Sequence, residues 1–516
     1  MRVLGVLLGG LLYALAVPPV DCGAFAWLAL VPVLLAVRGQ AAVSAFSYGC
    51  LFGYAYGWAT LWSLADTAVR YFHLVMPLGA TAAALWFLVV VGVPFGLFAA
   101  AAGAVLNRLG FVVSLVVVPA LWVASELLRG RLIGQPWGLL GYTQHRELAL
   151  AQVAALTGVY GVSFLLALGS TALAETIHRL LVRDSLGRAL RVLIAPAAVI
   201  GVCWLTGLRA LSAAGTPASD SATGRTQQVA IVQTNVTPAA RWTPSYTGAQ
   251  VGAHLRRTDD ISPATRPALI VWPENAVPRY LEADPFLASR LAESARRHHA
   301  DLLLGAPRYE DGRSYNSVRL ITASGRNGGH YDKRRLVLFA EEKPFTPRAD
   351  GDPNRDPDAF ASGTGPGVLQ SFVRLGVSVC HEILHPDLIN DSVRNGAELL
   401  VNVANDSWLD GLSEGAGLQH LAMATFRAIE TRRYLVRAAI TGASAVIDPF
   451  GRVVGVLPPG QAGVLTAPVT GLDTLTWYVR VGDLFAFVCV VVALWGLALC
   501  VVARHASPAI PARREL

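Results

Sequence analysis

The chain has 516 residues, of which 53% are hydrophobic and only 15% are charged, and its mean hydropathy is +0.47. Soluble globular proteins are usually about 25% charged, so this composition excludes a purely soluble protein. The net charge of +7 does not indicate nucleic-acid binding, because the basic residues form no patch interleaved with aromatic residues. Charge is scarce before Arg179 and after Asp483, and close to ordinary between Gln228 and Arg452. The chain is therefore expected to combine a membrane part with a polar domain that has its own core.

Eight apolar segments have roughly the length that crosses a bilayer. Seven precede the polar domain and one follows it, at about Val3–Val17, Ala24–Val37, Val43–Leu64, Pro77–Val105, Phe111–Leu127, Leu148–Ala174, Val192–Leu211 and Leu484–Ala503. The first is short, and with Arg2 before it and Ala14-Leu15-Ala16 near its end it has features of a signal peptide. Because a second apolar segment follows almost at once, we expect a retained first helix. Eight spans place both termini on one side of the membrane.

Arginine residues between these segments indicate the orientation, because cytoplasmic loops are enriched in Lys and Arg. One side carries Arg2, Arg38, Arg108, Arg179, Arg183, Arg188, Arg191, Arg504, Arg513 and Arg514. The other side carries Asp21, Asp66, Arg70, Arg129, Arg131 and Arg146. The first side is the more basic, so we expect cytoplasmic termini and an extracytoplasmic polar domain. Two roles stay open for Arg129, Arg131 and Arg146, which break the rule: ordinary interfacial arginines, or phosphate contacts to a lipid headgroup.

The composition divides the chain into five parts. A membrane domain at 1–211 is followed by a linker at 212–226, rich in Ala, Ser, Gly, Thr and Pro, and by the polar domain at 227–470. A connector and the eighth span occupy 471–503, and a cytoplasmic tail occupies 504–516.

Short β-branched runs alternate with helical stretches in the polar domain. The runs are Val229–Val232, Leu269–Val271, Leu302–Leu304, Ser317–Ile321, Val373–Val379, Leu399–Val403 and Val436–Ile440, and the clearest helices are Pro285–His299 and Gln419–Arg433. Strands that alternate with helices predict an α/β domain.

One of these runs, Val373–Val379, ends on Cys380, which is followed by His381 and Glu382. The pattern predicts a buried strand that delivers a thiol to the carboxyl edge of a sheet, where α/β folds place their chemistry. Cys380 is the only cysteine in the polar half of the chain, since the other five lie in or beside apolar segments. A lone thiol is either an inert buried residue or a nucleophile.

Two more expected strand ends carry reactive groups. Glu274 follows Leu269–Val271, and Lys333, one of only two lysines in the chain, follows Tyr331-Asp332. A carboxylate, an ammonium and a thiol are the parts needed for acyl transfer through a thioester: a general base, a cation that holds the oxyanion together with a backbone N–H, and a nucleophile. Alone, each residue is unremarkable, but three such motifs at strand edges favour a catalytic interpretation.

In this order the three residues resemble the Glu-Lys-Cys triad of the nitrilase superfamily, which has an αββα sandwich fold. More narrowly, the whole chain resembles the apolipoprotein N-acyltransferase family, in which a nitrilase domain is inserted before the last of eight membrane helices. The supporting stretches are Ala16-Val17-Pro18-Pro19, Ala26-Trp27-Leu28-Ala29-Leu30, Gln135-Pro136-Trp137, Gly141-Tyr142, Gln233-Thr234-Asn235, Tyr315-Asn316-Ser317 and Asn405-Asp406-Ser407-Trp408. The resemblance implies a polytopic α-helical membrane domain of eight spans and an extracytoplasmic α/β nitrilase-like domain.

The resemblance also implies roles for individual residues. Glu274 matches the base, Lys333 the oxyanion stabiliser and Cys380 the nucleophile. Three further residues match supporting positions: a second essential glutamate near the active site, a tryptophan on an active-site loop, and the acidic residue two past the nucleophile. These are Glu341, Trp242 and Glu382.

The chain departs from the family pattern at several positions. Leu338 and Ala340 replace a Pro and a Gly, and Glu342-Lys343 replaces an apolar pair. His381 supports the site where an aromatic residue usually follows the cysteine, and Ile440 stands where Asn is common. These departures bear on substrate preference and loop flexibility rather than on the triad.

The implied reaction has two membrane-anchored substrates. Cys380 takes an acyl chain from a membrane phospholipid and releases a lysophospholipid, and the free α-amino group of a diacylglyceryl-modified N-terminal cysteine on a lipoprotein attacks the thioester. An active site held against the outer leaflet gains a high effective concentration of both substrates. The resemblance implies no cofactor, no metal and no nucleic-acid partner, and a monomer in the plasma or inner membrane.

Two rival functions remain open. His381-Glu382-Ile383-Leu384-His385 spells the H-E-x-x-H signature of zinc metalloproteases, which needs a helix to bring both imidazoles to one face. A β-branched strand leads into the string and Pro386 follows it, which disfavours that helix. The second rival is a membrane-tethered amidase or nitrilase that uses water as the acceptor.

Overall fold

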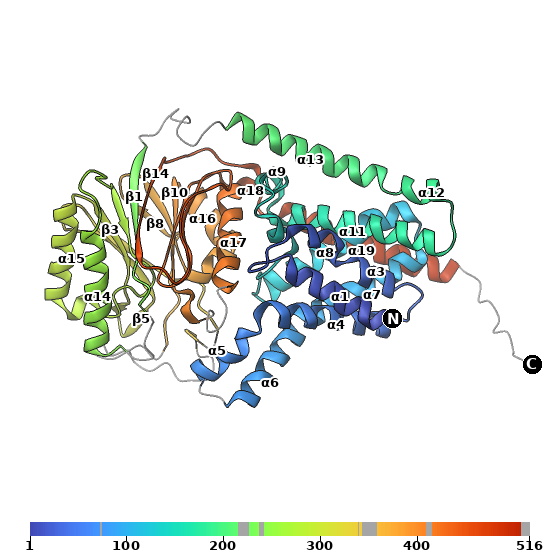
Figure 1. The fold of residues 1–516 in the computed structure, drawn as a ribbon, viewed down its shortest axis with the longest axis horizontal. Coiled ribbons are helices and arrows are strands. Elements are labelled where there is room, and N and C mark those ends of the chain that lie inside the picture. The colour runs from blue at the N-terminus through green and yellow to red at the C-terminus, as the bar shows by residue number, and fades with distance from the viewer. Residues whose placement is uncertain are drawn as a thin grey trace, which may run out of the picture.

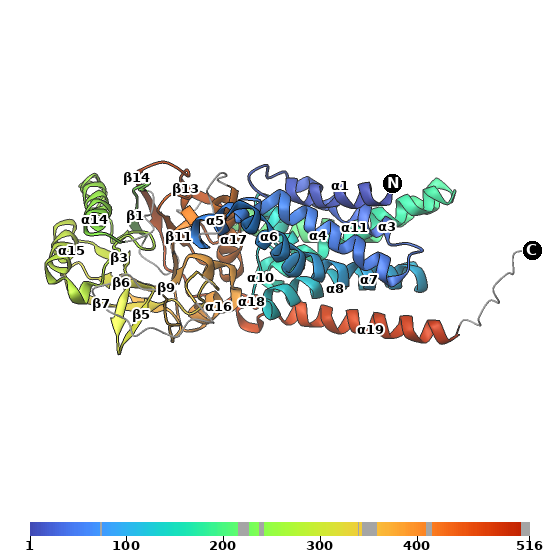
Figure 2. The ribbon, with the colours of Figure 1, turned by 90° about the horizontal axis from the view of Figure 1, so that it is seen from below.

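The computed structural model places a helical body and an α/β body side by side along the long axis of the molecule (Figure 1). It describes residues 1–72, 75–214, 226–236, 242–338, 340–342, 359–408 and 415–506. Most of the expected linker, Lys343 and the tail residues 507–516 lie outside the described residues. The chain builds most of the helical body first, then the α/β body, and returns to the helical body with its last helix, α19 (Leu484–Ala506) (Figure 2).

The helical body contains apolar helices of different lengths. Within the described residues, five are long and apolar enough to cross a membrane: Met76–Arg108, Phe111–Leu132, Val159–Leu181, Leu186–Ala213 and Leu484–Arg504. Shorter apolar helices cover Arg2–Leu15, Gly23–Ala36 and Leu148–Thr157, and a 20-residue helix covers Ala42–Leu61. The α-helical elements are α1 (Arg2–Leu15), α2 (Ala26–Ala29), α3 (Val31–Ala36), α4 (Ala42–Leu61), α5 (Ser63–Phe72), α6 (Met76–Trp86), α7 (Val93–Arg108), α8 (Phe111–Leu127), α9 (Leu148–Ala151), α10 (Ala154–Thr157), α11 (Val159–Leu181), α12 (Leu186–Arg191) and α13 (Ile194–Ala213).

The sixth expected segment, Leu148–Ala174, is interrupted rather than continuous. Helices α9 and α10 end before Gly158, and α11 begins at Val159. Gly158 has a φ of +66°, and a Cβ built there would lie 2.5 Å from Cε2 of Tyr478. Glycine alone tolerates both the left-handed backbone and this close approach. The chain therefore turns at Gly158, and α11 is the part of this segment that is long enough to span.

The α/β body is a sandwich of two sheets. In the described part of the chain each sheet has six strands, in the orders β14-β1-β2-β3-β6-β7 and β13-β12-β11-β10-β9-β8, and β4 and β5 form a separate pair. The first sheet contains β1 (Gln227–Gln233), β2 (Leu269–Val271), β3 (Asp301–Gly305), β6 (Ser317–Ile321), β7 (Asn327–Asp332) and β14 (Gly463–Val469). The second contains β8 (Val368–Gln370), β9 (Arg374–Val379), β10 (Leu399–Ala404), β11 (Leu435–Ala439), β12 (Ser444–Ile447) and β13 (Val453–Leu457), and the pair is β4 (Arg308–Glu310) and β5 (Arg313–Tyr315).

Helices cover both outer faces of the sandwich, which gives an αββα order of layers (Figure 1). Helices α14 (Pro244–Asp259) and α15 (Pro285–His298) cover the first sheet, and α16 (Pro386–Arg394) and α17 (Gly415–Thr431) cover the second. Side chains alternate along each strand, so Val229 and Val377 pack between the sheets while Val232 and Leu400 pack beneath the helices. Each fully buried Val or Leu contributes roughly 1.5–3 kcal/mol, so these layers carry much of the stability.

Several sequence predictions are confirmed by these elements. The runs at Leu269–Val271 and Ser317–Ile321 are β2 and β6, and the helix expected from Pro285 is α15. The predicted runs did not include β4, β5, β7, β8, β12, β13 or β14. Strand β13 buries none of its side chains fully, and β14 contains Pro468, so neither has the buried β-branched pattern of the predicted runs.

Helix α17 joins the two bodies. It lies between the second sheet and the membrane helices in both views (Figures 1 and 2), and almost all of its residues are buried. One apolar core runs from the membrane helices through Phe426 and Ile429 to the strands beneath them. Two buried charges lie in this junction: Arg427 donates to Glu430 at 3.0 Å and to the Tyr142 hydroxyl at 3.0 Å. The Glu430 carboxylate also accepts the Val159 N–H at the start of α11, at 2.9 Å.

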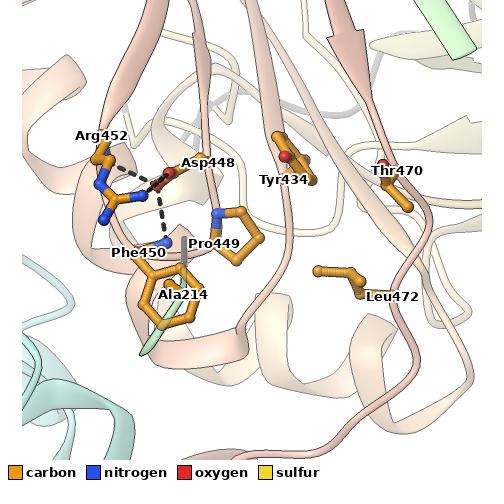
Figure 3. Close-up of a pocket in the computed structure, with 8 residues that line it drawn as sticks. All are labelled: Ala214, Tyr434, Asp448, Pro449, Phe450, Arg452, Thr470 and Leu472. Atoms are coloured by element: carbon orange, nitrogen blue, oxygen red, sulfur yellow. Dashed lines mark hydrogen bonds and ion pairs between the residues drawn. The ribbon is translucent and has the colours of Figure 1, made fainter. Parts of the chain in front are cut away.

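A second junction lies at the end of α13. Arg452 donates to the Leu211 carbonyl at 2.8 Å, and Asp448 accepts the backbone N–H groups of Phe450 and Arg452. Figure 3 shows the small cavity beside them, about 30 Å³, with Ala214 at its edge. The residues that line this cavity include none of the predicted site residues.

The three arginines with open roles each contact protein groups. Arg131 pairs with Asp483 and, at 2.8 Å, with Asp387 of the α/β body. Arg146 pairs with Asp21 at 2.6 Å, and Arg129 donates to the Gly138 carbonyl at 3.3 Å. Arg131 therefore helps to hold the two bodies together.

Replacement of Arg427 by leucine is expected to destabilise the folded protein by about 3 kcal/mol, because it leaves the buried Glu430 carboxylate without its cation. The double variant Arg427→Leu with Glu430→Gln should recover part of this loss, since the glutamine still accepts the Val159 N–H without a charge. The free energy of unfolding in detergent measures both effects. Arg257 and Asp260 form a matched exposed pair at the same spacing and the same 3.0 Å, and Arg257→Leu should cost at most about 1 kcal/mol. Equal losses at the two pairs would contradict the junction role of Arg427.

Candidate active site

Glu274, Lys333 and Cys380 meet at one end of the sandwich. Glu274 follows β2 and Lys333 follows β7, both in the first sheet, whereas Cys380 follows β9 in the second. All three are buried, with exposed fractions of 4%, 1% and 2%. The Lys333 ammonium lies 3.4 Å from the Glu274 carboxylate, and the Cys380 thiol donates to the Asn405 carbonyl at 3.9 Å, beside the backbone N–H that the same carboxylate accepts. The site is therefore assembled from the facing ends of both sheets.

The Glu274 carboxylate is fixed by contacts on both oxygens. Oε1 accepts from Asn316 Nδ2 at 2.7 Å and from Lys333, and Oε2 accepts the Asn405 backbone N–H at 3.0 Å. Gly305 of β3 lies directly behind, where a Cβ would come within 2.6 Å of the Glu274 Cα. Burial raises the pKa of Glu274, and the negative charge of Glu341 raises it further, while Lys333 opposes both. These contacts fix the position of the carboxylate.

Lys333 is enclosed by two carboxylates. Its ammonium donates to Glu341 Oε1 at 2.9 Å as well as facing Glu274, and its backbone N–H and carbonyl bond to Asn316 and Gly363. Burial alone would lower the pKa of Lys333, but the two negative charges outweigh it and raise the pKa well above the usual value. Lys333 is therefore a fixed positive charge beside the thiol.

The backbone at Cys380 has an unusual conformation. Its φ is +53°, in the left-handed region that a residue with a side chain adopts only rarely, and Asn275 beside Glu274 has a φ of +54°. Such conformations persist where the surrounding structure enforces them, and they cluster at functional sites. Burial raises the pKa of the Cys380 thiol, and the charge of Glu274 raises it more than Lys333 lowers it. Burial and the Glu274 charge therefore both favour the neutral thiol.

Glu382 connects the segment after Cys380 to the segment around Lys333. Its carboxylate accepts the Val379 N–H at 2.8 Å, the Arg334 N–H at 2.7 Å and the Tyr331 hydroxyl at 2.9 Å. Glu382 is fully buried, so each of these hydrogen bonds is protected from water. The carboxylate thereby fixes the spacing between the thiol and the ammonium.

Glu341 shares the Asn316 amide with Glu274 and also accepts the Val337 N–H at 2.8 Å. Glu341 thereby holds the segment that follows Lys333 against the Lys333 ammonium. Trp242 is partly buried immediately before α14, and its expected part in the active site stays a prediction.

The H-E-x-x-H string does not form the helix that a zinc site of this type needs. Cys380–Leu384 is a single 3₁₀ turn, His385 is extended, and the rings of His381 and His385 stand at 89° to each other. Glu382, which would act as the general base of a metalloprotease, instead makes the hydrogen bonds that tie two loops together. Among the described residues, no group of three His, Cys, Asp or Glu side chains is arranged to hold a metal ion.

Comparisons with known proteins cover both bodies. Residues 9–172 match the family described as apolipoprotein N-acyltransferase N-terminal domain, and residues 228–474 match carbon-nitrogen hydrolase. The apolipoprotein N-acyltransferase of Geobacter metallireducens is 33% identical over 502 residues, which covers 94% of this chain and 92% of the relative. The chain belongs to the apolipoprotein N-acyltransferase family. Its relatives in Pseudomonas aeruginosa (32% identical, covering 92% of this chain and 91% of the relative) and Azotobacter vinelandii (38%, covering 70% and 68%) carry the same name.

Membership of the apolipoprotein N-acyltransferase family makes the protein an N-acyltransferase with a nitrilase-like domain. Sequence reasoning quoted Asn316 and Asn405 within family motifs but gave them no role. The structure shows that Asn316 bridges Glu274 and Glu341, and that the Asn405 backbone binds Glu274 and lies near the Cys380 sulfur. The only hint of these roles in the sequence is the position of the two residues, because each directly follows a short strand: β5 for Asn316 and β10 for Asn405.

The raised pKa of Glu274 predicts the pH dependence of this N-acyltransferase. A base acts only when it is ionised, so the rate should fall as the pH drops through a value above the roughly 4.3 of an ordinary glutamate. Glu341→Gln removes one negative neighbour, so the acid limb of the pH–rate profile should move to lower pH even if the maximal rate falls. Initial rates normalised to each variant's maximum measure the limb. The exposed neighbour Glu342 gives the control, since Glu342→Gln should leave the limb in place. A limb that stays put in Glu341→Gln would show that the titrating group is not Glu274.

Proposed function

We propose that the protein transfers an acyl chain from a membrane phospholipid, through a thioester on Cys380, to the α-amino group of the N-terminal diacylglyceryl-cysteine of lipoproteins. The observation that carries the proposal is that the Lys333 ammonium and the Asn405 backbone N–H both contact the Glu274 carboxylate, while the Asn405 carbonyl accepts from the Cys380 thiol. A base, a cation and a thiol brought together at one point are what a covalent acyl transfer requires. Family membership supplies the class of reaction and its lipoprotein acceptor.

In the first half-reaction, Glu274 takes the proton of the Cys380 thiol while the sulfur bonds to the ester carbonyl carbon of the phospholipid. Negative charge develops on the carbonyl oxygen, where the Lys333 ammonium and a backbone N–H stabilise it. The carbon–oxygen bond to the glycerol then breaks, and Glu274 returns the proton to the leaving alkoxide. The products are a lysophospholipid and the Cys380 thioester.

In the second half-reaction, the neutral α-amino group of the lipoprotein attacks the thioester carbonyl. Glu274 accepts a proton from the attacking nitrogen, and the carbon–sulfur bond breaks to give an amide. The proton then passes to the Cys380 sulfur, which restores the resting thiol. Water in place of the amine would give the hydrolysis that the amidase alternative requires.

The proposal includes an orientation. Eight spans with both termini in the cytoplasm would hold the nitrilase-like domain, residues 227–470, outside the cytoplasm beside the outer leaflet. The close junction through α17 supports an active site kept near the membrane, where both lipid-linked substrates are concentrated. We further propose that a monomer carries out both half-reactions, because the contacts that define the site all come from one chain.

The enzyme given phospholipid without an amine acceptor should accumulate a hydroxylamine-labile acyl adduct on Cys380. Intact mass spectrometry of the protein purified from membranes detects it. Cys380→Ala should abolish the adduct and the turnover, and Cys380→Ser should be nearly inactive, because a hydroxyl needs far stronger activation than a thiol. Cys489→Ala, at a buried cysteine of α19, should keep the adduct. Turnover that survives in Cys380→Ala would show that Cys380 is not the nucleophile.

Lys333→Arg should fold and insert but lose thioester formation roughly a hundred- to a thousandfold, the usual effect of losing one oxyanion donor. The ammonium is a compact charge that fits between Glu274 and Glu341, whereas a guanidinium is wider and planar. Single-turnover acylation measures the loss. Lys343→Arg, at the chain's other lysine, should be nearly silent. Near-normal acylation in Lys333→Arg would mean that the positive charge alone matters.

A topology reporter fused after Thr226 should register outside the cytoplasm, and one fused after Leu516 inside, because the arginine-rich loops mark the cytoplasmic side. Accessibility of the two fusions in intact cells and in opened cells distinguishes the sides. Cytoplasmic accessibility of the first fusion would contradict both the orientation and the lipoprotein acceptor.

A further inference from the structure

A row of buried polar side chains crosses the second sheet behind Cys380. Ser378 of β9, Asn402 of β10 and Arg437 of β11 are register partners on adjacent strands. Asn402 and Arg437 are fully buried, and Ser378 nearly so. Because Val401 and Val403 pack between the sheets, alternation along β10 turns Asn402 toward the other face, which α17 covers. A polar row in this apolar layer is costly unless its groups are hydrogen-bonded.

At one end the row bonds to the backbone of the candidate nucleophile. Asn402 Nδ2 donates to the Cys380 carbonyl at 3.2 Å and to the Ser378 hydroxyl at 3.0 Å. Arg437 donates to the Asn402 Oδ1, which fixes the amide orientation. Because Cys380 has a φ of +53°, its carbonyl needs a partner that holds the strained turn. Asn402 is that partner.

At the other end the row reaches α17. Arg437 donates to both Asp406 oxygens, at 2.9 and 2.7 Å, and His420 of α17 lies 2.8 Å from Asp406 through Nδ1. Burial would raise the pKa of Asp406, but Arg437 and His420 outweigh it and lower the pKa well below the usual value. The carboxylate therefore stays ionised and neutralises Arg437.

The membrane domain contacts the end of the row that lies at α17. The ring centroid of Trp137 lies 4.6 Å from that of His420, and Trp137 Nε1 donates to Gln419 Oε1 at 2.7 Å. Gln419 Nε2 in turn donates to the Pro18 carbonyl at 2.9 Å. Two segments of the membrane domain that are far apart in the sequence thus contact neighbouring residues of α17.

We propose that this continuous set of contacts, from Trp137 and Gln419 through His420, Asp406, Arg437 and Asn402 to the Cys380 carbonyl, positions the nucleophile. We call it the positioning chain. Through it, the contact between the membrane domain and α17 sets the reactive conformation of Cys380, so that acylation is fast only when the two domains are docked. Its members are positioning residues, since they touch Cys380 or each other and not the reacting atoms. The inference rests on the proposed function in taking Cys380 as the nucleophile.

Two variants interrupt the positioning chain at different places. Asn402→Asp keeps an acceptor for Arg437 but removes the N–H groups that hold the Cys380 carbonyl. Gln419→Leu removes the bridge between Trp137 and Pro18, at the end of the positioning chain that is farthest from the thiol. Displacing a reacting group by about 1 Å costs roughly a hundredfold in rate. We therefore expect about a hundredfold slower acylation in Asn402→Asp and about a tenfold slower one in Gln419→Leu.

Gln152→Leu is the matched control. Gln152 belongs to the membrane domain, but like Gln419 it is a buried glutamine that donates to a carbonyl of the other domain, in this case that of Phe450 at 3.0 Å, and it lies outside the positioning chain. This variant should lose a comparable amount of stability and keep the wild-type acylation rate.

The experiment uses the full chain reconstituted in phospholipid vesicles. Single-turnover acylation of Cys380 is measured by mass spectrometry at several phospholipid fractions, and the iodoacetamide alkylation rate of Cys380 is measured by peptide mapping. In Asn402→Asp and Gln419→Leu the maximal acylation rate and the alkylation rate should both fall, with the half-saturating phospholipid fraction unchanged. Wild-type rates in Gln419→Leu, or an equal loss in Gln152→Leu, would overturn the inference. A wild-type enzyme that forms no Cys380 adduct would instead overturn the proposed function.

Discussion

The structure of the active site depends on one buried charge, the Lys333 ammonium. An unpaired ammonium in a protein interior is prohibitively unfavourable, and here Glu274 and Glu341 both face it. Burial raises the pKa of the Cys380 thiol, and the charge of the Glu274 carboxylate raises it further, so both favour the neutral thiol at rest. In the proposed reaction, the proton moves as the sulfur bonds to the acyl carbonyl carbon and negative charge develops on the carbonyl oxygen, which the ammonium stabilises. The proposed site thereby couples deprotonation of the thiol to its attack on the substrate.

The fold supplies the geometry that this charge balance needs. The acid and the ammonium come from one sheet and the thiol from the other, and Glu382 bonds to both segments. Behind the thiol, the second sheet rests on α17, which is packed into the membrane domain. The membrane domain therefore forms part of the support of the reaction centre as well as its anchor. Arg427 and Glu430 show how closely the two bodies are joined, since both are buried in the junction.

Much of the sandwich could be predicted from the sequence, because its central strands are continuous apolar runs. The run at Leu269–Val271 is bounded by Pro267 and Pro273, and the structure gives β2 the same limits. Glu274 and Cys380 were identified because they follow such runs, and Lys333 because it is one of only two lysines and follows Tyr331-Asp332. Asn402, Arg437 and His420 were not, since their partners depend on the register of three strands and on the docking of α17. Hydropathy also missed the turn at Gly158, whose cause is a close approach to Tyr478, a residue far along the chain.

We expect Cys380 to be a neutral thiol at rest and to lose its proton to Glu274 only as the sulfur attacks the acyl carbonyl. The most direct test is the infrared spectrum of the resting enzyme at neutral pH, with the Cys380 S–H stretch assigned as the band lost in Cys380→Ala. We expect this band to be present without substrate and thiolate absorption in the ultraviolet to be absent. A resting thiolate, seen as missing S–H intensity together with ultraviolet absorption that Cys380→Ala removes, would contradict it.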